Sequence, residues 1–201
     1  MLTLYHNPLS RSTVVHHMLH EIGEPFEIVP IDLQKKEQKS PEFLKINPMG
    51  KIPVLTDGDT IVTEGPAILV YLADKYPKAA LAPAIDAPER GSYLRWMFFY
   101  GSVFEPAATD HYMKRESPAG TVGWGTLDNA LDTISAGLEP GPWLLGARFS
   151  AADVLIGSGL AYMMGFNVFP PRPEYVAYVA RIEARPAYKA AKAADAARFG
   201  G

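Results

Sequence analysis

A short segment that places a proline directly before an apolar strand constrains this chain more than any other feature. The segment runs Asn47-Pro48-Met49-Gly50-Lys51-Ile52-Pro53-Val54-Leu55. Proline has no N–H to donate, so Pro53 is expected at the first residue of a strand or at a sheet edge. If the Ile52–Pro53 bond is cis, the turn presents the N–H and C=O of Ile52 to an extended peptide, which can add as a further strand. The segment therefore predicts half of a peptide-binding site.

A second segment, Thr63-Glu64-Gly65-Pro66-Ala67-Ile68, follows a short acidic turn. Pro66 suits the first position of a helix, and the amides around Glu64 and Gly65 are then free to meet an anion. We expect an α-carboxylate to bind there.

Together these segments resemble the glutathione-binding half of the glutathione S-transferases. In that family the residue before the cis-proline pairs with the cysteinyl backbone of glutathione, and an acid followed by Ser or Gly holds its γ-glutamyl end. The resemblance extends over the whole chain, through Leu72-Ala73-Asp74-Lys75-Tyr76-Pro77 and Ser150-Ala151-Ala152-Asp153. It is strongest to bacterial beta-class or theta-like members. It implies glutathione as co-substrate, a small hydrophobic electrophile, a role in detoxification and a homodimer.

Composition narrows the function classes. The 201 residues include 48% apolar residues, enough for a substantial core, and the net charge of −3 gives no basic face for nucleic acid. There is no cysteine. Disulfides, thiolate metal ligands and the catalytic cysteine of beta-class relatives are therefore excluded. The start lacks signal-peptide features and no segment is long enough to span a membrane, so we expect a cytoplasmic protein with no membrane partner.

The pattern of turns and apolar residues predicts an α/β N-terminal thioredoxin-like domain with the order βαβαββα. The expected elements are strands at 2–5, 26–31, 51–56 and 60–62, and helices from the loop after residue 8 to Gly23, at 41–46 and at 66–75. Helical periodicity alone recurs later in the chain, including the helix that Ser150 and Asp153 begin as a capping box. We expect domains at 1–77 and 88–201, the second all-α, with a proline-rich linker at 78–87.

The catalytic candidates are Ser10 and Ser12, where the first strand feeds the first helix. A thiol with a pKa of about 8.5 is mostly protonated at neutral pH, so a transferase needs a hydrogen-bond donor and a favourable field at the sulfur. By the resemblance Ser10 is the preferred donor, and a helix N-cap is the competing interpretation of Ser12. Arg11 would add positive charge near the sulfur. Tyr5 is the donor position of other transferase classes, but here we expect a core or interface tyrosine, because Tyr5 continues the strand alternation.

The resemblance assigns glutathione binding to Ile52 and Pro53 for backbone pairing and to Glu64 and Gly65 for the γ-glutamyl group. Lys51 joins this set. Lys36 is placed near the glycyl carboxylate, with Lys35 as the alternative.

The electrophile pocket is expected between the helical domain and the glutathione site, with Tyr100, His111, Phe166 and Phe169 as its lining. His16 and His20 have helical spacing that suits a metal, but no third ligand is evident and the HExxH pattern is absent, so no metal is expected.

Two other functions are alternatives to the predicted transferase. One is a glutathione-dependent cis-trans isomerase of the maleylacetoacetate type, although this chain lacks the Ser-Ser-Cys run of those enzymes. The other is a transferase-like binding or regulatory protein without turnover. Retention on immobilised glutathione favours an enzyme or a ligand carrier over a scaffold.

Overall fold

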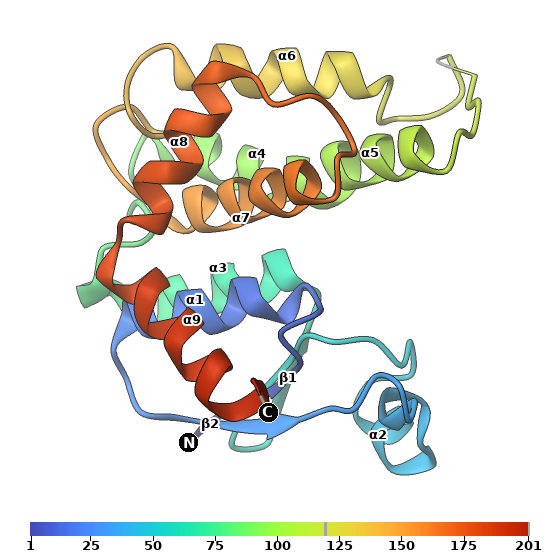
Figure 1. Cartoon of the computed structure of the whole chain (residues 1–201). Coiled ribbons are helices and arrows are strands. Elements are labelled where there is room, and N and C mark those ends of the chain that lie inside the picture. The colour runs from blue at the N-terminus through green and yellow to red at the C-terminus, as the bar shows by residue number, and fades with distance from the viewer. Residues whose placement is uncertain (119, 201) are drawn as a thin grey trace. The chain divides into compact units, whose positions relative to one another are not determined.

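The computed structural model describes residues 1–118 and 120–200, which fall into two compact units. The first consists of residues 1–79 together with 185–201, and the second of residues 80–184. Figure 1 shows the elements of both. The C-terminal helix thus belongs with the N-terminal unit, whereas the domain limits expected from the sequence grouped it with the helical half. Its packing against the first helix accounts for the difference.

The first unit is built on a mixed sheet with the strand order β2-β1-β3-β4. Its elements are β1 (Leu2–His6), α1 (Ser12–Ile22), β2 (Phe26–Pro30), η1 (Glu37–Lys39), α2 (Pro41–Ile46), β3 (Val54–Asp57), β4 (Thr60–Thr63), α3 (Gly65–Lys75), η2 (Pro77–Ala79) and α9 (Pro186–Phe199). β1 pairs with β2 in parallel and with β3 antiparallel. The predicted thioredoxin-like order is confirmed. Gly23 ends α1 in the left-handed conformation, with φ of 76°, as a glycine C-cap does.

Strand alternation assigns the helices of this unit to two faces of the sheet. Leu2, Leu4 and His6 are buried on one face, and His6 contacts α1 and α9 there. Tyr5 points to the other face, where its ring meets Phe43 of α2 edge-on at 5.6 Å between centroids. This is the core role predicted for Tyr5 from the period of two in a strand.

In the described residues of the second unit, the regular structure is helical apart from two isolated bridges, Trp143 with Gly146 and Leu145 with Arg148. These bridges depart from the predicted all-α character, because Gly146 at φ of 70° turns the chain back on itself. The helices are α4 (Arg90–Phe99), η3 (Tyr100–Phe104), α5 (Glu105–Tyr112), α6 (Leu127–Leu138), α7 (Ala151–Gly165) and α8 (Pro173–Glu183). Ser150 and Asp153 form the predicted capping box at the start of α7.

One feature of this unit departs from the regular helix that the apolar spacing predicts. Residues 100–104 form a π-helical turn between α4 and α5. Pro106 stands in the first turn of α5 and has no N–H for the carbonyl four residues earlier, so the regular ladder is interrupted there. None of the helices in the described part of the chain combines the length and apolar character that crossing a bilayer requires.

α9 lies beside α1 (Figure 1), and charged side chains join the two helices. At its start, Arg185 donates two hydrogen bonds to Glu21, at 2.5 and 2.7 Å, and His17 lies 3.1 Å from the same carboxylate. Burial raises the pKa of Glu21, but the bonds from Arg185 and His17 outweigh burial and hold that pKa at about 2. Glu21 is therefore ionised in the folded protein at neutral pH.

The Glu21 cluster predicts a pH-dependent contribution to stability. A carboxyl whose pKa falls on folding stabilises the protein above its unfolded pKa, and the effect disappears as the pH falls through the folded pKa. We expect Glu21→Gln to lower the free energy of unfolding by roughly 2 kcal/mol at pH 7. The difference should narrow as the pH falls from 4.5 towards about 2. Urea unfolding at several pH values measures it. The substitution Glu24→Gln, at an exposed position, is the control. A difference in unfolding free energy between Glu21→Gln and wild type that stays constant with pH would contradict this account.

Close packing predicts the consequence of adding a methyl group in the second unit. A Cβ on Gly159 of α7 would lie 2.5 Å from Tyr100 and 3.3 Å from Phe104, both rigid rings, whereas a Cβ on Gly165 of the same helix would meet nothing within 4 Å. Both substitutions gain the same helix propensity, up to about 1 kcal/mol. We expect Gly159→Ala to lower stability by about 1–3 kcal/mol and Gly165→Ala not to lower it. Thermal unfolding compares them, and equal stability of the two variants would refute the packing argument.

Candidate active site

Three predicted segments meet at one end of the sheet. Tyr5 pairs with Val54, and Val54 pairs with Thr63. The loop after β1, the turn before β3 and the start of α3 all lie just beyond this row of paired residues. The strand registers alone therefore bring together residues from widely separated parts of the sequence.

The turn before β3 has the form that the sequence predicts. The Ile52–Pro53 peptide bond is cis. Asn47 supports the turn, since its side-chain amide donates to the Lys51 carbonyl at 2.9 Å and its carbonyl oxygen accepts from the Met49 N–H at 3.1 Å. In the described residues, neither backbone polar group of Ile52 has a hydrogen-bond partner, and the residue is half-buried. An extended peptide can therefore pair with it.

The start of α3 lies directly against this turn. A Cβ built on Gly65 would be 4.0 Å from Cγ of Pro53. Glu64 immediately precedes the helix at φ of 66° and ψ of 115°, and its exposed side chain makes no capping hydrogen bond. A non-glycine residue in this region costs on the order of 1–3 kcal/mol and persists where the surroundings hold it. The exposed Glu64 side chain and the start of α3 thus lie beside the turn at Ile52–Pro53.

Ser10 and Ser12 lie together in the loop after β1, but they differ in exposure. Their hydroxyl oxygens are 2.7 Å apart. Ser10 is half-buried, and its oxygen lies 2.8 Å from the Asn7 carbonyl. Ser12 is fully buried and accepts a hydrogen bond from the Asn7 N–H at 3.0 Å. Only Ser10 can meet a ligand that arrives from solvent.

The N-cap interpretation of Ser12 is wrong. α1 begins at Ser12 itself, and Arg11 holds the cap position without a side-chain capping bond. The hydroxyl of Ser12 points into the protein instead, where it contacts Nδ1 of His6 at 2.7 Å. Arg11, the expected positive charge, is half-buried between the two serines in sequence.

A buried His-Asp-His cluster lies behind the serines, and no local sequence pattern connects its three members. Nε2 of His6 is 2.9 Å and Nδ1 of His16 is 2.8 Å from the same carboxylate oxygen of Asp195, on α9. All three residues are less than one-tenth exposed. Burial raises the pKa of Asp195, but the two imidazoles beside it outweigh burial and hold that pKa well below its usual range. The carboxylate is therefore ionised at neutral pH.

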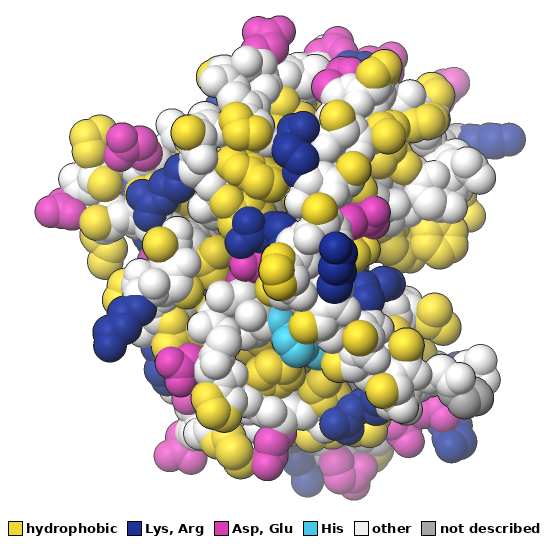
Figure 2. Space-filling model, turned by 60° about the vertical axis from the view of Figure 1, so that its left-hand side comes forward, with side chains coloured by type: hydrophobic (Ala, Val, Ile, Leu, Met, Phe, Trp, Pro, Cys, Tyr) yellow, Lys and Arg dark blue, Asp and Glu magenta, His cyan; other side chains and the backbone are white. Residues whose placement is uncertain are grey.

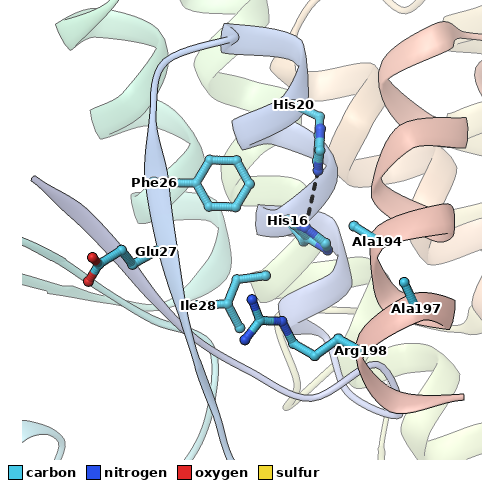
Figure 3. Close-up of a pocket in the computed structure, with 8 residues that line it drawn as sticks. All are labelled: His16, His20, Phe26, Glu27, Ile28, Ala194, Ala197 and Arg198. Atoms are coloured by element: carbon cyan, nitrogen blue, oxygen red, sulfur yellow. Dashed lines mark hydrogen bonds between the residues drawn. The ribbon is translucent and has the colours of Figure 1, made fainter. Parts of the chain in front are cut away.

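The cluster borders a surface cavity of about 700 Å³ in the same unit. Figure 3 shows its lining: His16, His20, Phe26, Glu27, Ile28, Ala194, Ala197 and Arg198. Nε2 of His20 is 3.2 Å from Nε2 of His16, and burial, followed by the neighbouring histidines, lowers the pKa of His20. Figure 2 shows imidazole atoms reaching the surface among apolar side chains. The helical spacing of His16 and His20 thus brings their rings into contact, and Asp195 and His6 lie beside them, although the sequence shows no further ligand.

Among the described residues, this cluster also has a set of side chains that could bind a metal ion. One donor atom each from His6, His16 and Asp195 lies within 4.8 Å of the others. Two imidazoles and a carboxylate are a ligand type that several transition metals accept.

The predicted lysines differ in their surroundings. Lys36 is exposed at φ of 57°, ahead of η1, and Lys51 is exposed next to the cis turn. Lys35 forms an ion pair with Asp32 at 3.2 Å. Lys39 was not singled out from the sequence, yet its ammonium donates to the Met49 carbonyl at 2.9 Å and so helps to hold the turn.

The four residues expected to line an electrophile pocket all belong to the second unit. Tyr100 and Phe169 are buried in its core, where both rings pack against Phe104. Phe166 is 59% exposed and stacks on Tyr162, and His111 is also exposed. The structure does not gather these four side chains on one surface of this unit.

Comparison with known proteins assigns the family. The model of the glutathione S-transferase N-terminal domain matches residues 1–74, and that of the C-terminal domain matches residues 83–190. Glutathione S-transferase 3 of Zea mays is 34% identical, over 98% of this chain and 90% of its own.

Two crystal structures extend the likeness to the fold. A glutathione transferase from Methylococcus capsulatus has a TM-score of 0.82 at 33% identity, covering 98% of this chain and all of its own. A sphingomonad glutathione S-transferase complexed with glutathione has a TM-score of 0.77 at 31% identity, covering 96% and 98%. With both domain models matched in order along the sequence, the chain belongs to the glutathione S-transferase family.

Proposed function

We propose that this protein is a glutathione S-transferase that binds glutathione at the end of the sheet and activates its thiol as the thiolate. The thiolate attacks a carbon of a small hydrophobic electrophile, so that a C–S bond forms and the displaced group leaves with the electron pair. The meeting of Ser10, Ile52 and Glu64 beyond the paired residues Tyr5, Val54 and Thr63 carries this proposal.

Thiolate stabilisation is assigned to Ser10. Its half-buried hydroxyl is the accessible one of the two serines, and it stands just before α1, whose N-terminal amides and dipole favour negative charge. Ser12, fully buried, supports Ser10 from behind. Each unit by which the thiol pKa falls corresponds to about 1.4 kcal/mol of preference for the thiolate.

Glutathione itself is held along its length. The free N–H and C=O of Ile52 pair with the cysteinyl backbone, with Pro53 shaping the turn. Glu64 and Gly65 bind the γ-glutamyl end. The exposed Lys36 and Lys51 attract the glycyl carboxylate, and Arg11 adds positive charge near the sulfur.

The electrophile meets the exposed members of the predicted set, Phe166 and His111, while Tyr100 and Phe169 support them as core residues. The reaction needs no metal. A cytoplasmic location, a homodimer, a role in detoxification and a beta- or theta-like subclass complete the proposal, and these rest on the sequence and the family resemblance. Neither the isomerase nor the non-catalytic binding protein is supported by the comparisons.

Removing the Ser10 hydroxyl tests the activation step. Ser10→Ala should raise the pKa of bound glutathione by about 1–2 units and lower kcat/KM by about 10- to 100-fold at neutral pH, because the thiolate loses its donor. Titration of the thiolate absorbance in the complex measures the shift. Ser10→Thr, which keeps a hydroxyl, should retain much of the effect.

The surface variant Ser102→Ala, in the second unit, is the control for this experiment. If Ser10→Ala leaves both the bound thiol pKa and kcat/KM at wild-type values, the assignment of Ser10 is refuted.

A further inference from the structure

Two histidines of α1 line the surface cavity of the N-terminal unit. His16 and His20 are four residues apart in the helix, and their Nε2 atoms lie 3.2 Å from each other. Figure 3 shows the two imidazoles between β2 and α9, joined by a dashed line. We propose that this pair binds one divalent transition-metal ion of the kind that imidazole prefers, such as Zn²⁺, and that Asp195 orients His16 for it. The inference does not depend on the proposed transferase function.

The separation of the two nitrogens fits two ligands of one ion. Zn²⁺ binds imidazole nitrogen at about 2.0–2.1 Å in a tetrahedral shell, so two of its nitrogen ligands lie about 3.3 Å from each other. Nε2 of His16 and Nε2 of His20 are at 3.2 Å. The same distance also fits a hydrogen bond between the two rings, and the ion would take the place of that hydrogen. The backbone of α1 therefore already holds the two nitrogens at ligand spacing.

Behind His16, Asp195 supplies the support that metal-binding histidines commonly have. A histidine ligand normally turns its other ring nitrogen to a carboxylate or carbonyl, which orients the ring and makes the ligand nitrogen more basic. Nδ1 of His16 lies 2.8 Å from the Asp195 carboxylate, and both side chains are buried. An ion on Nε2 leaves the ring hydrogen on Nδ1, on the side of this carboxylate. The spacing of the histidines in the sequence does not show this partner, because Asp195 belongs to α9.

The cavity gives an ion an entrance and room for further ligands. Its volume is about 700 Å³, and Phe26 and Ile28 of β2 line it together with Ala194 and Ala197 of α9. His20 is half-buried, so its ring can be reached from this side. Two protein ligands leave a four-coordinate ion two positions for water or an added small ligand.

The inner set of His6, His16 and Asp195 is the competing place for an ion. Its three ligand atoms lie within 4.8 Å of one another, but each of these residues is less than one-tenth exposed, so an ion there has little access to water as a fourth ligand. His16 would bind such an ion through Nδ1, whereas in the proposed site it binds through Nε2. The nitrogen of His16 that the ion contacts therefore distinguishes the two places.

Isothermal titration calorimetry of the full chain, without a polyhistidine tag, measures the site. We expect wild type to bind one Zn²⁺ per chain and not to bind Mg²⁺, which prefers oxygen ligands. His20→Ala removes a ligand and should weaken Zn²⁺ binding by at least about 100-fold, since loss of a supporting partner alone costs about 10- to 100-fold. Two controls should keep the Kd close to that of wild type: His6→Gln changes only the inner set, and His111→Ala removes an exposed imidazole of the second unit.

Charge in the cavity gives a second test, which separates a cation site from an anion site. Arg198 lines the cavity and is exposed, and its guanidinium repels a cation. The exposed Glu27 points away from the histidines in Figure 3. Arg198→Gln should therefore strengthen Zn²⁺ binding about two- to fivefold, as the loss of one exposed charge allows. A lower affinity for Zn²⁺ in this variant would contradict a cation site here.

The calorimetric outcomes decide the proposal. If wild type binds no Zn²⁺, or if His20→Ala binds it as tightly as wild type does, the proposal is refuted. If His6→Gln loses Zn²⁺ binding while His20→Ala keeps it, the ion occupies the inner set and the proposed site is equally overturned.

A measurement on the unaltered protein locates the ion even if a variant fails to fold. Nitrogen-15 NMR of the imidazoles identifies the ring nitrogens that Zn²⁺ contacts. We expect Zn²⁺ on Nε2 of both His16 and His20, and on neither nitrogen of His6. Zn²⁺ on Nδ1 of His16 and Nε2 of His6 would overturn the inference.

Discussion

The carboxylate of Asp195 is the group on which the N-terminal unit and its site depend. One oxygen contacts His6 of β1 and His16 of α1, and so joins the C-terminal helix to the first strand and the first helix. An ionised carboxylate in the interior is stable only when such donors surround it, and removing one partner leaves an uncompensated charge. The same contact orients His6 towards Ser12. The contact between Asp195 and His6 therefore both joins α9 to the sheet and positions the ring that contacts Ser12.

Much of the fold follows from local sequence signals. Gly23 stops α1, Asp57-Gly58-Asp59 turns the hairpin, and Ser150 with Asp153 begins α7, each through backbone chemistry that involves near neighbours. The π-helical turn at 100–104 was missed because apolar spacing does not show a broken hydrogen-bond ladder, although Pro106 is its signal. That α9 packs in the N-terminal unit could not be predicted, because its sequence is rich in alanine and its partners lie far away in the sequence, in α1.

The site was predictable where it depends on backbone turns and not where it depends on distant side chains. The turn at Ile52–Pro53 and the helix start at Glu64 carry their own residue signatures. The sequence gives a weaker signal for His6. It occupies an inward position in the alternation Leu2, Leu4, His6, and a buried polar residue requires a hydrogen-bond partner. That partner, Asp195, is 189 residues away, and no local pattern connects them.

A crystal structure of the protein with glutathione would test the account most directly. It should show the cysteinyl backbone paired with Ile52 and the sulfur within about 3.5 Å of the Ser10 hydroxyl, as a hydrogen bond to the thiolate requires. A sulfur placed against Tyr5, or out of reach of Ser10 while Ile52 is occupied, would contradict it.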